Sequence, residues 1–179
     1  GMILLMISNG LLVTLLTLRA DGLGFSESTI GLIQSAYPVG SLIGCLIAPK
    51  LIMRVGHIRI FAAFASIASA TALIHLVTND PLSWGAMRLL QGFCFSGLYI
   101  VAESWLNGSA SNETRASLLS TYFITQTGGV MIGQLLLNLS SPEGIFLFIV
   151  VSVLISFSLV PMLVSASAIP PYVPPERIS

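Results

Sequence analysis

The stretch from residue 82 to residue 106 reads LSWGAMRLLQGFCFSGLYIVAESWL and carries only two acidic or basic side chains, Arg88 and Glu103. An α-helix needs about 20 mostly apolar residues to cross the hydrocarbon core of a bilayer, which is about 30 Å thick. Lipid offers no hydrogen-bond partners to the backbone, so a run of this kind is typical of a transmembrane helix.

Five further apolar runs share this character and contain no Asp, Glu, Lys or Arg; they cover residues 2–18, 28–49, 60–78, 116–139 and 144–164. The 179-residue chain is 55% hydrophobic and 8% charged, with a mean hydropathy of +0.95. Soluble domains usually carry about 25% charged residues. The first run lacks the basic start and the small-residue cleavage site of a signal peptide, so we interpret it as a retained helix. The sequence therefore predicts an all-α membrane protein with six transmembrane helices within residues 1–164.

Composition also argues against several classes of function. The net charge is zero and the aromatic residues are not interleaved with basic ones, which argues against nucleic-acid binding. No phosphate-binding loop, nucleophile elbow or metal-ligand spacing occurs, so we expect no enzyme activity, cofactor or metal. Arg88 and Glu103 lie about 22 Å apart along one helix, too far for a shared acid–base site. Cys45 and Cys94 both fall in apolar runs and are expected to be small packing residues without a disulfide.

Basic residues are unevenly shared between the two ends of the predicted helices. One end carries Lys50, Arg54, Arg59, Arg115 and Arg177, whereas the other carries Arg19 and Arg88. The basic end should be cytoplasmic, which places both termini in the cytoplasm. Residues 165–179 contain four prolines and are expected to form a cytoplasmic tail or the start of a central linker.

Two segments resemble signatures of the major facilitator superfamily. The run from Gly44 to Arg59 is similar to its loop 2–3 signature at Arg54, Gly56 and Arg59, with Met53 where the signature has Asp. Arg88-Leu-Leu-Gln-Gly92 resembles the helix 4 signature, and Tyr99-Ile-Val-Ala-Glu103 followed by Arg115 is similar to sugar porters. The YcaD-like bacterial permeases are a closer likeness, which rests on four short motifs: Leu18-Arg19-Ala20, Ser35-Ala36-Tyr37, Val55-Gly-His-Ile-Arg59 and Glu103-Ser-Trp-Leu-Asn107.

This resemblance implies one half of a major-facilitator fold, the N-terminal one, built from two inverted three-helix repeats. Residues 2–78 and 82–164 show no convincing similarity, so the repeat is implied by the resemblance alone. The implied function is a half-length secondary transporter in the bacterial cytoplasmic (inner) membrane, moving a small-molecule substrate by alternating access. A second six-helix half or a homodimer would complete it. The alternative is a truncated or split, non-transporting membrane protein that assembles with a second half.

Uncharged polar side chains at membrane depth are the candidate substrate contacts. In this superfamily helices 1, 2, 4 and 5 line the central cavity, and Asn9, Gln34, Gln91 and Gln126 lie on the corresponding runs, as does Gln134. Burying a polar group in a membrane costs free energy unless the group is hydrogen-bonded to a partner or hydrated. Hydrogen bonding between helices is the alternative role for each of them.

The two intramembrane charges suggest gating and coupling. Glu103 lies at the depth of Arg54, Arg59 and Arg115, and the sugar-porter likeness implies that it forms an ion pair in a cytoplasmic gate. A proton carrier or a simple exposed residue are the alternatives. Arg88 is a coupling candidate by resemblance, or else snorkels to the outer interface near Trp84. His75 is interpreted as an interfacial residue rather than a proton relay.

Small residues recur every four positions on the second run, at Ala36, Gly40, Gly44 and Ala48, and a second such pair is Gly129 and Gly133. Such stripes let helix backbones approach closely. Close helix packing is the first interpretation, and a sliding surface for rocking motions is the second. Pro38 is expected to kink its helix.

Overall fold

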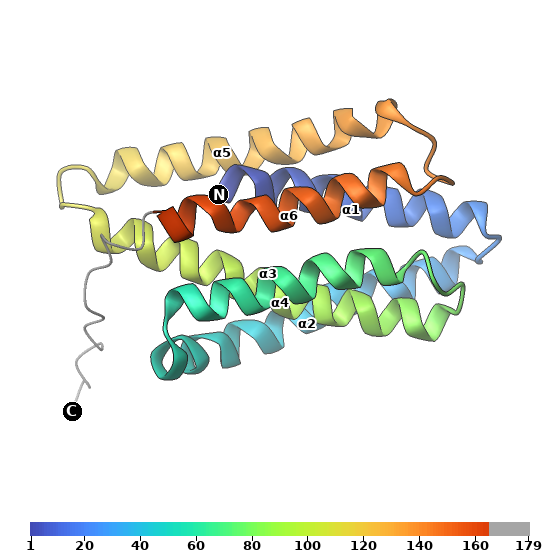
Figure 1. Cartoon of the computed structure of the whole chain (residues 1–179), viewed down its shortest axis with the longest axis horizontal. Coiled ribbons are helices and arrows are strands. Elements are labelled where there is room, and N and C mark those ends of the chain that lie inside the picture. Colours follow the sequence, from blue (N-terminus) through green and yellow to red (C-terminus); the bar gives the residue numbers. More distant parts are fainter. Residues whose placement is uncertain (165–179) are drawn as a thin grey trace.

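The computed structural model describes residues 1–164 and contains no strand within them. Six α-helices and one 3₁₀ turn follow one another along the chain (Figure 1): α1 (Met2–Gly22), α2 (Glu27–Val55), α3 (His57–Ile74), α4 (Pro81–Ser109), α5 (Arg115–Leu136), η1 (Leu137–Leu139) and α6 (Phe146–Val164). The α2–α3 turn and the α4–α5 loop lie at one end of the bundle, and the other three connections lie at the opposite end. The predicted proline-rich tail, residues 165–179, lies outside the described residues.

Capping residues and one glycine set several helix ends. The hydroxyl of Ser26 accepts a hydrogen bond from the backbone N–H of Thr29 at the start of α2 (3.2 Å), and Asp80 accepts one from Ser83 at the start of α4 (2.8 Å). Gly56 alone separates α2 from α3, with a φ of 99° that favours glycine. Neither Pro38 nor Pro49 ends α2, which continues six residues beyond the predicted boundary at residue 49.

Five of the six helices are long and apolar enough to cross a membrane, and α5 is the exception. Its 22 residues would span about 33 Å, so its length is sufficient. Its apolar character is diluted by hydroxyl and amide side chains: Ser117, Ser120, Thr121, Thr125, Gln126, Thr127 and Gln134. The six predicted helices are therefore confirmed, with α5 distinguished by its polarity.

The packing of the helices has an internal symmetry. The most extensive contacts join α2 to α4 and α1 to α5; α3 packs on α4 and α6, and α6 packs on α1. Exchanging α1–α3 for α4–α6 maps this set of pairs onto itself: α2–α4 becomes α5–α1, α3–α4 becomes α6–α1, and α3–α6 is unchanged. This is the arrangement expected of two inverted three-helix repeats, one half of a major-facilitator fold.

Glycines make the two main helix crossings possible, and they follow the same symmetry. Gly40 and Gly44 of α2 lie against the α4 backbone around Gly92, and Gly129 and Gly133 of α5 lie against α1 around Gly10. In the first crossing the hydroxyl of Ser41 also donates to the carbonyl of Gly92 (3.1 Å). The structure thus supports the close-packing interpretation of both stripes. It also pairs Asn9-Gly10 with Gln91-Gly92, a correspondence too short to detect by comparing the sequences.

Arg19 has a packing role at the less basic end of the bundle. Its Nη1 atom donates to the carbonyl oxygens of Pro142 (3.4 Å), Glu143 and Gly144 (3.5 Å), and its guanidinium lies 5.6 Å from the centre of the Phe148 ring. These contacts fix the loop that enters α6 to the end of α1. A basic residue at this end is therefore explained by the structure.

Candidate functional site

Two of the candidate glutamines link helices. The amide nitrogen of Gln34 on α2 donates to the Thr17 hydroxyl (2.9 Å) and the Val13 carbonyl (3.3 Å) of α1. The amide nitrogen of Gln134 on α5 donates to the carbonyl of Gly10 (2.9 Å), also on α1. For both residues the structure supports interhelical hydrogen bonding, the alternative to a substrate contact.

A second polar group gathers around Asn9. This side chain, Tyr37 of α2 and Tyr99 of α4 are close enough to interact, and the Phe95 ring lies near both tyrosine rings (6.4 and 5.9 Å between centroids). The Oδ1 atom of Asn9 and the hydroxyl of Tyr99 are both buried inside the bundle. Asn9 therefore lies in a polar cluster with the two tyrosines, between α1, α2 and α4.

Arg88 is buried inside the bundle, with only 2% of its surface exposed. Its Nη1 atom donates to Oε1 of Gln91 (3.0 Å), and its guanidinium lies 4.4 Å from the centre of the Tyr37 ring. Among the described residues no carboxylate forms a salt bridge with it. The snorkelling alternative is therefore wrong, because the side chain turns inward and a ring face and an amide stabilise its charge.

Three polar or aromatic neighbours of Arg88 are also buried. Trp84 is fully buried and its indole N–H donates to the carbonyl of Thr78 in the α3–α4 connection (2.7 Å). His75 is likewise buried, with Nδ1 2.7 Å from the carbonyl of Thr71 and its ring edge-on to Trp84. Gln91 is completely buried as the partner of Arg88, so it does not reach an open surface in this structure.

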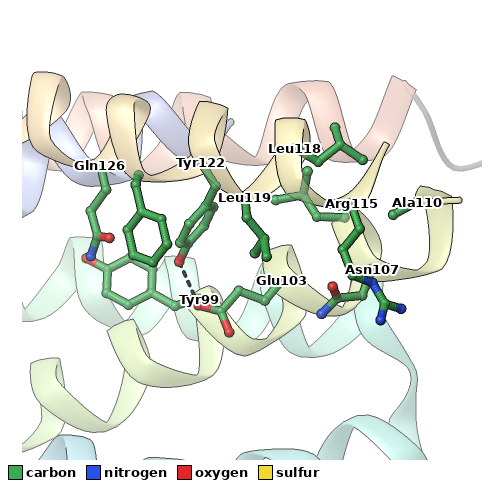
Figure 2. Close-up of a pocket in the computed structure, with 11 residues that line it drawn as sticks. Tyr99, Glu103, Asn107, Ala110, Arg115, Leu118, Leu119, Tyr122 and Gln126 are labelled. Carbon is green, nitrogen blue, oxygen red and sulfur yellow. Dashed lines mark hydrogen bonds between the residues drawn. The ribbon is translucent and has the colours of Figure 1, made fainter. Parts of the chain in front are cut away.

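Glu103 lies in a pocket of about 320 Å³ between α4 and the first half of α5 (Figure 2). Eleven residues line this α4–α5 pocket: Tyr99, Glu103, Leu106, Asn107, Ala110, Arg115, Leu118, Leu119, Tyr122, Phe123 and Gln126. The hydroxyl of Tyr122 donates to Oε1 of Glu103 at 2.7 Å. Two of the sequence-predicted site residues, Arg115 and Gln126, thus line the same pocket as Glu103.

The predicted arginine partner of Glu103 is replaced by Tyr122. No salt bridge joins Glu103 to any arginine in the described part of the chain, and Arg54 and Arg59 are exposed at the ends of α2 and α3, outside the pocket. Tyr122 contacts Glu103 because the two residues lie at the same position along the bundle axis. Arg115 begins α5 seven residues, or about 10 Å, before Tyr122.

Sequence reasoning missed the three tyrosines Tyr37, Tyr99 and Tyr122. The chain has four tyrosines, and these three lie within apolar runs. A buried tyrosine hydroxyl usually finds a hydrogen-bond partner, so hydroxyls at membrane depth were an available signal. Their convergence on Asn9, Arg88 and Glu103 is visible only in the folded chain.

Comparison with known proteins gives a consistent result. The family description "Major Facilitator Superfamily" matches residues 1–179. An uncharacterised MFS-type transporter of Yersinia pestis is 29% identical over 163 residues, covering 91% of this chain and 43% of that protein. One from Yersinia enterocolitica is 30% identical over 164 residues, with the same coverage, and the transporter YcaD of Salmonella arizonae is 31% identical over 144 residues, 80% of this chain and 37% of that protein. The chain therefore spans less than half the length of these relatives. No solved structure matches it significantly.

Proposed function

The chain belongs to the Major Facilitator Superfamily, and on that premise we propose that it is one half of a secondary transporter that moves a small solute by alternating access. The family and the apolar helices make it an integral membrane protein and point to a transporter rather than an enzyme. The half-length character, the solute and the transport cycle are parts of the proposal.

One observation carries this proposal: polar side chains on α1, α4 and α5 remain partly exposed within an otherwise apolar bundle. They are Asn9, Tyr99, Glu103 and Gln126, the last three of which line the α4–α5 pocket. Polar groups facing lipid are costly, whereas the same groups facing a water-filled cavity are solvated. We assign this face to a central cavity that a second six-helix half completes.

The second half has three possible sources: further residues of a longer chain, a separate protein, or a second copy of this chain. The length of the relatives favours a partner of similar size. The alternative function is a non-transporting membrane protein that assembles with such a half. In that case the polar face would be a static interface, closed to water on both sides of the membrane.

We further propose that both termini are cytoplasmic and that the membrane is a bacterial inner membrane. The basic loops at one end of the bundle support the first statement, and the bacterial relatives support the second. Glu103, held by Tyr122 with Arg115 nearby, is assigned to the cytoplasmic gate, and Arg88 remains the coupling candidate.

The experiment is thiol labelling from each side of the membrane. In a background with Cys45 and Cys94 replaced by Ala, single cysteines are placed at Gln126 and at Ile124, which lies on the same helix and is 73% exposed. Vesicles of both orientations, containing this chain with a second half, are treated with a membrane-impermeant maleimide. We expect labelling at position 126 from both sides, as alternating access requires, and protection at position 124.

Labelling of position 126 from one side only would exclude alternating access, and labelling from neither side would favour the non-transporting alternative. Equal labelling at both positions would remove the assignment of a cavity face.

A further inference from the structure

The α4–α5 pocket carries opposite charges that do not pair with each other. Glu103 and Arg115 both line it, yet no salt bridge joins them within the described residues. In Figure 2 the Glu103 carboxylate lies near Tyr122, whereas the Arg115 guanidinium lies near Asn107, farther along the pocket. The pocket therefore has one anionic end and one cationic end.

The anionic end is also suited to an organic cation. Three aromatic residues, Tyr99, Tyr122 and Phe123, line the pocket with Glu103, and aromatic ring faces attract cations. Tyr122 orients the carboxylate through its 2.7 Å hydrogen bond. Tyr99 supplies a third aromatic ring to the wall, while its buried hydroxyl lies against Asn9 and Tyr37.

Between the two ends the lining is aliphatic. Leu106 of α4 and Leu118 and Leu119 of α5 complete the wall. The volume of about 320 Å³ is at the lower end of the range for ligand pockets, roughly 300–1,000 Å³. A ligand that matches the pocket is small, with separated charges and an apolar middle.

We propose that the α4–α5 pocket binds a small zwitterion whose ammonium and carboxylate groups are separated by a short apolar chain. The ammonium lies against Glu103 and the tyrosine rings, and the carboxylate pairs with Arg115 beside Asn107. A molecule with both charges on one carbon, such as glycine, has no apolar chain to lie against Leu106, Leu118 and Leu119. As a statement about the transported substrate, this inference rests on the proposed function; as a statement about binding, it does not require transport.

The test is calorimetric titration of the purified chain in lipid nanodiscs with 6-aminohexanoate. Three compounds serve as controls: pentylamine lacks the carboxylate, hexanoate lacks the amine, and glycine lacks the apolar chain. We expect saturable binding of 6-aminohexanoate at least about tenfold tighter than that of each control, because the first two controls each lose a charge-assisted hydrogen bond and glycine loses the burial of its chain. Equal binding of pentylamine, or no binding of 6-aminohexanoate, would overturn the proposal.

Variants of the chain then locate the site. Glu103→Gln and Arg115→Gln should each weaken 6-aminohexanoate binding about tenfold or more. Two matched controls remove one charge outside the pocket, Glu113→Gln in the α4–α5 connection and Arg54→Gln at the end of α2, and should bind as the parent chain does. Unchanged binding in both pocket variants would place the ligand elsewhere and refute the proposal. The comparison of ligands on the parent chain does not depend on the folding of any variant.

The binding experiment and the labelling experiment test the zwitterion site and the transport proposal independently. Binding of 6-aminohexanoate without two-sided labelling at position 126 would keep the site and refute transport. Two-sided labelling without binding would keep transport and refute the zwitterion site.

Discussion

The crossing of α2 and α4 should not tolerate a single added methyl group at Gly40 or Gly92. A Cβ atom at Gly40 would lie 2.7 Å from the carbonyl carbon of Leu89, and one at Gly92 would lie 2.9 Å from the backbone nitrogen of Ser41. Both distances are shorter than real Cβ contacts, and both partners are backbone atoms. Relief therefore requires one helix to move as a whole.

Two other glycines on the same helices provide matched controls. A Cβ atom at Gly31 of α2 or Gly85 of α4 would meet nothing within 4 Å. Gly→Ala inside a helix gains up to about 1 kcal/mol from backbone propensity, so Gly31→Ala and Gly85→Ala should be neutral or stabilising by that amount. Gly40→Ala and Gly92→Ala gain the same term but carry an overpacking cost of about 1–3 kcal/mol. The difference in unfolding free energy between a crossing variant and its control isolates the overpacking cost. We expect a value near the upper end of that range, because backbone atoms line both sides of the crossing.

The assay is equilibrium unfolding in mixed micelles with increasing dodecyl sulfate, followed by tryptophan fluorescence. Trp84 is fully buried on α4 and reports on this region. The symmetry predicts the same contrast in α5 between Gly133→Ala, where a Cβ atom would lie 2.7 Å from the backbone nitrogen of Leu11, and Gly128→Ala, which meets nothing within 4 Å. If Gly40→Ala and Gly31→Ala unfold at the same midpoint, the crossing is looser than described and the packing argument is wrong.

Three further predictions follow from the ends and the interior of the bundle. Reporter fusions at Gly56 and Asn79 should report the cytoplasm and the opposite side respectively; the same side for both would contradict the helix count. Gln91→Leu should cost roughly 1.5–3 kcal/mol because Arg88 loses its hydrogen-bond acceptor, and adding Arg88→Met should restore much of this stability by removing the buried charge. A double variant no more stable than Gln91→Leu would refute this account. The Ser83 backbone N–H lowers the pKa of Asp80, so the parent chain should be more stable than Asp80→Asn above pH of about 4 and lose this advantage as acid protonates Asp80; thermal unfolding against pH measures it, and a pH-independent difference would contradict the assignment.

The sequence predicted the helices better than their ends. The apolar run from residue 28 stops at residue 49, but α2 continues to Val55 because Gly56 is the first residue that breaks the helical backbone. Lys50 and Arg54 belong to this extension, so charge marked the expected membrane boundary and not the end of the helix.

For the candidate site, the spacing of residues along the sequence predicted how far along the bundle each side chain lies, but not which way it points. Glu103, Arg54, Arg59 and Arg115 were correctly placed near one end of the bundle, yet the residue that contacts Glu103 is Tyr122. Arg88 was recognised as costly in a membrane, but its inward orientation depends on how α2 lies across α4, since Tyr37 covers the guanidinium.

By itself, therefore, the sequence determined that this is an all-α membrane protein with six helices in the order seen here, because backbone hydrogen bonding in lipid permits little else for apolar runs of this length. It also supplied the small-residue stripes that allow close crossings. The tertiary structure decided which stripes meet, and hence the inverted symmetry, the burial of Arg88 and the α4–α5 pocket. Hydropathy is a property of one segment of the chain. Which residues meet where two helices cross depends on the rotation and offset of one helix relative to the other, and the sequence of neither helix specifies this alone.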